Sequence, residues 1–555
     1  MKSSILVLAV FCRLASGSQA ADLSDQQLIH QQARQQALEA QLAPPPPEAV
    51  RLSVPEKTVP AAFPTEARCF PLTRVILTGT ENFPHWLPLT RLALQGEHHC
   101  LGTQGINQLM NRLQNRLIDS GYVTSRILAP AQDLNTGTLT LVAIPGKIRH
   151  IRYTPDSGNY IQRITPFPAR EGQLLDLRDI EQGLENLQQV PTVQANMHIE
   201  PDAQPGESDI VLDWRQVRHW RVAAYLDDSG TKSTGRYQGG FTVFLDNPLA
   251  LSDLFYLSAG RDIHTAAGQG SQNDTLHYSV PVGYWMAGIT ASHYDYHQTI
   301  AGLNQPVQYR GNSNNLSVQL SRVLYRNDDQ KTTLNSEIYR RTARNFIDDT
   351  EIEVQHRETA GWKLGLSHRH DIGSATLDTR VTYQRGMRWF GAQPAPEESQ
   401  NAGTALSKIT QFSATLSGPL RWFSQPFSYQ TQYLRQISTT PLTPQDQFSI
   451  GGRWTVRGFD GELTLSADRG WYSRNELDWH TPLHGQSLYL ALDYGEVGGR
   501  GSEALLGKHL AGSALGWRGS LKGVNYDLFV GVPLAKPAGF QTSPVTAGFN
   551  LYWQY

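Results

Sequence analysis

The chain has 555 residues, a formal net charge of −2 and a sequence pI of about 6.8. This balance provides no basic surface for nucleic acid and no acidic, solvating tail. Mean hydropathy is −0.40, and beyond the N-terminus there is no run of about 18 apolar residues that could form a membrane-spanning helix. Any membrane-embedded part must therefore be built from strands, and the length predicts two or more structural parts.

Residues 1–20 have the layout of a secretory signal peptide. Lys2 precedes an apolar stretch over residues 5–12, and small residues end the segment. Export leaves two cysteines, Cys69 and Cys100, in an oxidising compartment, where an even number favours a disulfide. We expect this bridge to be structural and not catalytic.

Residues 21–42 predict a helix that is polar on every side. Its glutamines leave almost no apolar stripe: Gln26, Gln27, Gln31, Gln32, Gln35, Gln36 and Gln41. Such a helix is either a frayed, solvated terminus or lies in a wet cavity, and the pattern alone leaves both open. The proline-rich residues 43–68 predict an extended tether, through which the helix can reach another part of the molecule.

Two small α+β modules are predicted next, at residues 69–148 and 149–214. In the first, a helix over residues 103–119 has apolar residues at helical spacing. Its strands are predicted near residues 72–77, 125–128 and 138–144. In the second, a helix over residues 177–189 has the same periodicity and ends before Pro191.

From residue 215 to residue 555 the alternation of apolar and polar residues replaces the helical pattern. In the last segment Phe549, Leu551, Trp553 and Tyr555 alternate with small or polar residues. A soluble β-sandwich also alternates, but a lipid-facing barrel explains the alternation, the aromatic chain end and the 48 glycines together. At about 10 residues per strand plus connections, the region predicts a transmembrane antiparallel β-barrel of about 16 strands.

Five short motifs carry a resemblance to a known family. They are Gly121-Tyr122-Val123-Thr124-Ser125-Arg126, Gly206-Glu207-Ser208-Asp209-Ile210, Asp246-Asn247-Pro248-Leu249, Val456-Arg457-Gly458-Phe459 and Arg474-Asn475-Glu476-Leu477. In these motifs the chain resembles the outer-membrane transporters of two-partner secretion, the TpsB family. Together with the barrel-assembly insertases these transporters form the Omp85 superfamily. The resemblance covers essentially the whole chain after residue 20.

The resemblance implies a role for each part of the chain. The two modules resemble POTRA domains, which lie in the periplasm and recognise a large, unfolded exoprotein of the TpsA type. The barrel lies in the outer membrane and passes that exoprotein to the cell surface. The helix over residues 21–42 is then a plug in the barrel lumen and not a frayed terminus. The pair Cys69 and Cys100 is similar to that of haemolysin-transporting members.

The motif Val456-Arg457-Gly458-Phe459 resembles the signature at the tip of the sixth extracellular loop, which in this family folds back into the pore. A desolvated guanidinium in that position needs a counter-charge. If the leucines among residues 488–492 face lipid, strand alternation directs Asp493 into the lumen. The same reasoning directs Glu476 there. We therefore expect Arg457 to pair with Asp493, with Glu476 as a second lumenal partner.

The remaining constellations indicate no further chemistry. His293, Asp295 and His297 share one strand face, but three ligands without a fourth are a weak metal signal. We expect no catalytic site, no cofactor and no metal, and a monomer surrounded by outer-membrane lipid. Two other functions are alternatives: an insertase that folds other barrels, which the module count disfavours, and a diffusive porin, which needs neither modules nor plug. The sequence does not identify the exported partner, which can be a haemolysin, an adhesin, a haem-binding protein or a contact-dependent toxin. It also does not show whether transport activates that partner.

Overall fold

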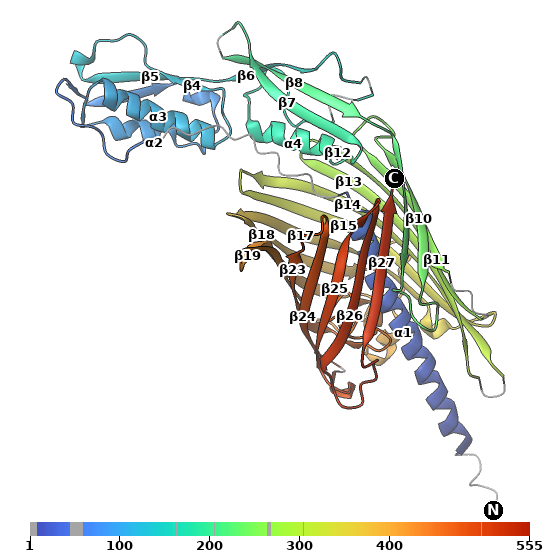
Figure 1. Ribbon diagram of the computed structural model, residues 1–555. Helices are drawn as coiled ribbons and strands as arrows, with labels where there is room; N and C mark the ends of the chain where they lie inside the picture. Colours follow the sequence, from blue (N-terminus) through green and yellow to red (C-terminus); the bar gives the residue numbers. More distant parts are fainter. Residues whose placement is uncertain are drawn as a thin grey trace, which may run out of the picture.

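The molecule is elongated, with three parts in a row and a long helix threaded through the last of them (Figure 1). The computed structural model describes residues 8–44, 59–158, 160–161, 165–204, 206–263, 268–302, 305–500 and 502–555, with side chains from Asp25 onward. Two α+β modules lie end to end, and the second sits on one rim of a β-barrel. Helix α1 (Leu8–Leu42) runs through the barrel and emerges beyond the far rim.

The first module packs helices on a three-stranded sheet of order β2-β5-β4. Its elements are β1 (Phe70–Pro71), β2 (Arg74–Thr78), α2 (Leu89–Ala93), β3 (Cys100–Leu101), α3 (Thr103–Asp119), β4 (Arg126–Leu128) and β5 (Thr138–Ile144). Leu109, Leu113 and Leu117 of α3 are fully buried in one core with the sheet, as the helical spacing predicts. A disulfide joins Cys69 to Cys100 across the small β1-β3 sheet, with Cα atoms 5.2 Å apart.

The second module repeats this plan and also contacts the barrel. Its elements are β6 (Lys147–Tyr153), α4 (Leu177–Gln188), β7 (Val193–Pro201) and β8 (Glu207–Gln216), with sheet order β6-β8-β7. One side of α4 is buried against the sheet. The other side meets the barrel rim, where the Asn186 side chain donates to the Gly283 carbonyl at 2.7 Å. The Tyr284 hydroxyl donates to Asp179 at 2.6 Å, so α4 serves two interfaces at once.

In the part of the chain that the structure describes, 16 long antiparallel strands close into a barrel. They are β9 (Trp220–Asp227), β10 (Gln238–Asp246), β11 (Leu254–Asp262), β12 (Gln269–Val282), β13 (Trp285–Ile300), β14 (Val307–Arg326), β15 (Gln330–Ile347), β17 (Arg357–Ile372), β18 (Ala375–Met387), β19 (Lys408–Trp422), β20 (Gln425–Ser438), β23 (Arg469–His480), β24 (Gln486–Gly498), β25 (His509–Leu521), β26 (Val524–Ala535) and β27 (Thr546–Gln554). The last strand pairs with the first, so no sheet edge is left to lipid. The short β16 (Thr350–Glu351) pairs with β15 alone. The predicted fold class is thus confirmed.

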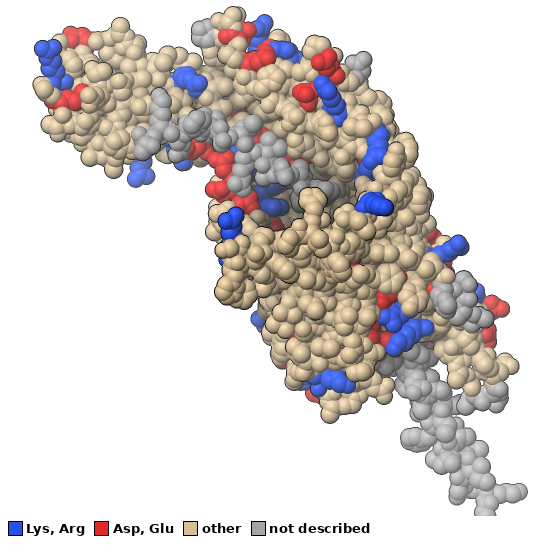
Figure 2. All heavy atoms as spheres, viewed as in Figure 1, with Lys and Arg blue, Asp and Glu red and all other residues tan. Residues whose placement is uncertain are grey.

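The outer wall of the barrel is apolar between two charged ends. Leu488, Leu490 and Leu492 of β24 are exposed on this wall, as their alternation predicts. Figure 2 shows that charged side chains gather near the modules and at the opposite end, with a broad band between them that is nearly free of charge on the visible face. Such a band matches the hydrocarbon layer of a bilayer. Among the described residues, no helix has the length and apolar character needed to cross a membrane.

Two segments before the modules differ from expectation. The helix predicted over residues 21–42 begins earlier, at Leu8, because no proline interrupts the sequence from there to Leu42. Residues 1–7 of the predicted signal peptide lie outside the described residues, and its remainder is continuous with α1. Within the predicted tether, residues 45–58 also lie outside the described residues. Residues 59–68 are not free, because they lie against α3 of the first module.

Candidate functional site

The long connection between β20 and β23, residues 439–468, folds back into the barrel. It carries the small hairpin β21 (Phe448–Ile450) with β22 (Leu465–Ala467), and Val456-Arg457-Gly458-Phe459 lies between these strands. Val456 and Phe459 are buried in an apolar cluster that includes residues of the barrel wall. Phe459 also packs edge-on against Phe540, with ring centroids 5.9 Å apart. The loop tip is therefore packed against the wall.

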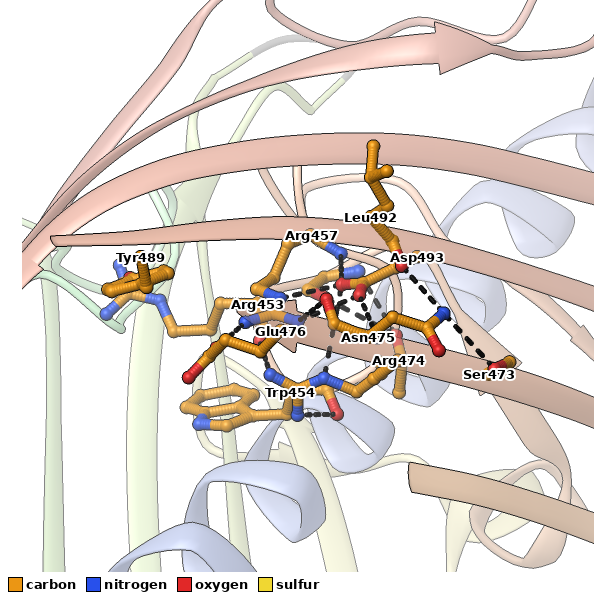
Figure 3. Close-up of polar contacts among 12 residues, drawn as sticks. Arg453, Trp454, Arg457, Ser473, Arg474, Asn475, Glu476, Tyr489, Leu492 and Asp493 are labelled. Atoms are coloured by element: carbon orange, nitrogen blue, oxygen red, sulfur yellow. Dashed lines mark hydrogen bonds and ion pairs between the residues drawn. The ribbon is translucent and has the colours of Figure 1, made fainter. Parts of the chain in front are cut away.

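Arg457 meets two carboxylates of the barrel wall (Figure 3). Its Nε and Nη2 atoms donate to the two oxygens of Asp493 at 2.7 and 2.8 Å. Its Nη1 atom donates to Glu476, and its backbone N–H donates to Asp493 at 3.0 Å. The Asp493 side chain is fully buried. This forked contact fixes both the position and the orientation of the loop tip, which a single point contact does not.

Neighbouring polar groups complete the site around Asp493. The backbone N–H of Asn475 donates to Asp493 at 3.2 Å, and Arg474 donates to the carbonyl of Trp454 in the loop at 3.0 Å. Arg518 of β25 donates to Glu476 at 2.6 Å. Residues from β23, β24 and β25 thus hold one loop tip through a continuous charged network, which lowers the desolvation penalty of each member.

Glycines give the loop room to approach the wall. A Cβ atom at Gly512 would lie 1.9 Å from the Arg457 carbonyl oxygen, and one at Gly531 would lie 2.9 Å from Cα of Gly458. Gly458 itself has φ +98°, in the left-handed region, and a Cβ atom there would lie 2.4 Å from the Val532 carbonyl oxygen. The glycine of the motif is therefore required by backbone conformation and by contact distance together.

Helix α1 crosses the lumen beside this loop and contacts the wall through neutral polar side chains. Gln27 donates to Thr231 and Ser233 in the connection between β9 and β10 at 3.2 and 3.0 Å, and Gln35 donates to Thr275 of β12 at 3.0 Å. The same wall donates from Ser313 to Gln31 at 3.1 Å. The glutamine-rich surface is thus explained, since these amides replace the water that would otherwise solvate the inner wall.

Three further contacts hold the helix. Near its C-terminal end, Leu38 and Leu42 are buried with a group of wall side chains: Ala223, Tyr225, Phe244 and Tyr256. Near the far rim, Asp25 lies 3.2 Å from Arg357 of β17. In the middle, the His30 ring packs edge-on against Trp454, with centroids 5.5 Å apart. The last contact joins the helix directly to the long loop.

The structure therefore brings together Arg457, Asp493 and Glu476, and it brings the predicted plug to their side. Sequence reasoning missed Asp25, Arg357 and Arg453, which pairs with Asp228 at 2.5 Å. No motif or spacing marked these residues, because each partner comes from a distant part of the chain. His293, Asp295 and His297, the weak metal signal of the sequence, do not belong to this site. His293 bonds to Asp295 and Asn314, and the described chain holds no cluster of three or more such ligands.

A family model for the haemolysin secretion/activation proteins ShlB/FhaC/HecB matches residues 206–519, more than half of the chain. The chain belongs to this family. Models of the ShlB-type POTRA domain and of a further POTRA domain match residues 70–146 and 147–201. The two modules are therefore POTRA domains.

Similar proteins agree with this assignment. The outer membrane transporter CdiB-2 of Burkholderia pseudomallei (strain 1026b) is 37% identical over 527 residues, which cover 91% of this chain and 90% of the relative. The hemolysin transporter protein ShlB of Serratia marcescens is 28% identical over 477 residues, covering 85% and 81%. The solved structure of CdiB from Acinetobacter baumannii matches with a TM-score of 0.82 at 30% identity, covering 97% of this chain and 98% of that one.

The chain is accordingly an outer-membrane transporter of two-partner secretion, with its POTRA domains in the periplasm. The predicted function is confirmed, and the insertase alternative is not supported. Since the POTRA domains lie at one rim, the opposite rim and its long loops face the cell exterior.

Proposed function

We propose that this protein carries a large, unfolded partner exoprotein from the periplasm to the cell surface through its barrel, and that it acts as a transporter and not as an enzyme. Haemolysins, adhesins and contact-dependent toxins are the candidate classes. Identity to the transporters named CdiB runs from 28 to 37%, whereas identity to the two hemolysin transporters is 27 and 28%. This difference favours a partner of the kind that CdiB transporters export. We further propose that the protein works as a monomer in outer-membrane lipid.

Export needs an open lumen, so either the loop or the helix must move. The loop tip is held by a buried, forked ion pair, and removing one partner of such a pair costs about 3–5 kcal/mol. The helix is held by neutral side-chain hydrogen bonds, each of which contributes only about 0.5–1.5 kcal/mol net, together with the Asp25–Arg357 pair near the rim and a small apolar cluster at Leu38 and Leu42. Water entering the lumen replaces those bonds. The helix is therefore the plug that leaves, and Arg457 keeps the loop in register against the wall while it does so.

The second POTRA domain offers an edge at which to capture the partner. In the sheet order β6-β8-β7, strand β7 has a neighbour on one side only among the residues that the structure describes. An extended peptide can add to such an edge through main-chain hydrogen bonds, which give affinity without demanding one sequence. This mode suits a transporter whose partner arrives unfolded.

The test ties the plug to the connection between β9 and β10. Gln27 and Thr231 are in hydrogen-bond contact at 3.2 Å, so a short bifunctional methanethiosulfonate reagent should bridge Gln27→Cys and Thr231→Cys through two disulfides and retain the helix. With the partner co-expressed, crosslinked cells should release little of it into the medium, and a reducing agent should restore release. Gln27→Cys alone with the reagent and the wild type with reducing agent are the controls. Undiminished secretion by the fully crosslinked pair would contradict an obligatory plug movement.

A further inference from the structure

The end of the linker that joins the plug to the first POTRA domain lies along helix α3 as a strap. The strap comprises residues 60–66, Pro60 to Glu66. Two side chains of α3 donate hydrogen bonds to its backbone carbonyl groups. Gln108 donates to the carbonyls of Pro60 and Ala62 at 2.7 and 2.8 Å. Arg112 donates to the carbonyls of Pro60 and Ala61 at 2.9 and 2.6 Å. These contacts recognise main chain in an extended segment and not particular side chains.

Two side chains of the strap give the surface its specificity. The Phe63 ring lies under the guanidinium of Arg112, 4.4 Å from its centroid, and edge-on to His99 at 5.1 Å. The Glu66 carboxylate accepts from the backbone N–H groups of three residues at the start of α3: Gly102, Gln104 and Gly105, at 2.7–2.9 Å. Partial desolvation opposes ionisation of Glu66, but these N–H donors outweigh it and lower the pKa of its carboxyl.

Most of the strap lies outside the core of the domain, although the partly buried ring of Phe63 packs against that core. The core face of α3 carries Leu109, Leu113 and Leu117, whereas Gln108 and Arg112 project from other positions toward the strap. Ala61 and Ala62 of the strap are exposed. The domain can therefore keep its core if another peptide takes the place of the strap and supplies an aromatic residue where Phe63 lies.

We propose that this surface of α3 is a binding site for an extended segment of the exported protein, with an aromatic residue followed three positions later by a carboxylate, and that the strap is its resting occupant. The proposal rests on the proposed function, because it assumes that an unfolded partner reaches the POTRA domains. The occupant is inferred from the strap itself. Phe63 and Glu66 of the strap have this spacing, and Gln108 and Arg112 bind backbone carbonyl groups, which every peptide has.

Displacement of the strap also lengthens the tether of the plug. From Leu42 to Pro60 the chain spans at most about 60 Å when fully extended. Freeing the strap adds about 30 Å, up to Cys69, where the disulfide to Cys100 stops the release. Binding of the partner at α3 is in this way coupled to the distance that the plug can travel.

The test measures binding of a fluorescently labelled probe to the full-length chain in detergent. The probe is an unfolded segment of the exported partner, which is expected to be a very large exported protein encoded in the neighbouring open reading frame. Glu66→Gln weakens the resting occupant, so the Kd of the probe should fall about three- to tenfold. Arg112→Ala removes a group that contacts both the strap and the probe, so it is tested in the Glu66→Gln background, where the strap competes less and the Kd should rise about tenfold. Glu81→Gln, an exposed carboxylate away from α3, is the matched control and should change nothing.

A second measurement does not depend on these variants. A photoreactive benzoylphenylalanine at Phe63 should crosslink to α3 or His99 at rest, and excess probe should reduce this crosslink several-fold. Equal probe affinity of the wild type and Glu66→Gln, or a crosslink that the probe leaves unchanged, overturns the strap site. If adding Arg112→Ala to Glu66→Gln tightens probe binding, the site is overturned as well, because Arg112 then does not contribute to binding the probe. Absence of binding to every form of the chain instead overturns the proposed function.

Discussion

Replacement of Arg457 tests the role of the extracellular loop most directly. In Arg457→Ala the Asp493 carboxylate loses its forked partner but keeps two backbone N–H donors, from residue 457 itself and from Asn475. Arg474 also remains 4.0 Å away. Breaking a buried pair costs about 3–5 kcal/mol, and these remaining partners favour the lower end, about 3 kcal/mol. The loss is local, because the barrel is closed by strand hydrogen bonds that do not involve the loop.

At about 1.4 kcal/mol per factor of ten, this loss raises the open fraction of the loop roughly 10²-fold. Hydrogen exchange of the backbone amides of residues 456–459 should accelerate by that order in Arg457→Ala. The protein should still insert and run as a heat-modifiable barrel on gels, while secretion of the partner falls strongly. Arg457→Lys should recover only part of the secretion, since an ammonium group cannot reproduce a forked contact.

The matched control is Arg388→Ala, which breaks an ion pair to Glu398 at 2.7 Å within the preceding extracellular loop. That pair is about a third exposed and does not touch the inner wall, so secretion should stay near the wild-type level. Wild-type secretion by Arg457→Ala, with accelerated exchange at residues 456–459, would refute the proposed role of the loop. Unchanged exchange would refute the energetic reasoning itself.

Three further predictions address other parts of the molecule. Replacing Cys69 and Cys100 by alanine should lower the free energy of unfolding of the first POTRA domain by about 3–4 kcal/mol without preventing barrel formation. Thermal unfolding measures this loss. Labelling of two free thiols in the unreduced wild type would contradict the disulfide. Deleting residues 21–42 should enlarge single-channel conductance in planar bilayers, and a conductance equal to that of the wild type would leave the helix without a plugging role. Burial raises the pKa of Asp176 to about 6, against the backbone N–H of Arg178. The contribution of this carboxyl to the stability of the second POTRA domain should therefore be greatest below about pH 4 and fall by up to about 3 kcal/mol as pH rises from 4 through 6. Denaturant unfolding of Asp176→Asn between pH 4 and 8 should show a flatter profile, and the same slope as in the wild type would exclude Asp176 as the cause.

Much of the architecture follows from local patterns in the sequence. Alternation over residues 215–555 predicts a barrel of about 16 strands, because lipid leaves no other way for strands to satisfy their backbone groups. Helical spacing predicts α3 and α4, whose observed bounds differ from expectation by no more than one residue. Parity along residues 488–492 directs Asp493 into the lumen, where it lies. Each of these inferences needs only neighbours along one strand or one helix.

Other features depend on contacts between distant segments, and the sequence carries no local sign of them. The polar surface of residues 25–42 suits bulk water and a barrel lumen equally, and only the closed wall decides between them. The strap is a second example. A proline-rich sequence predicts a free tether, and only the tertiary structure brings Gln108 and Arg112 of α3 to its carbonyl groups. Asp25 and Arg357 are 332 positions apart and meet only because the barrel closes around the helix. Periodicity determines which face a side chain occupies, whereas its partner depends on how the whole chain closes in three dimensions.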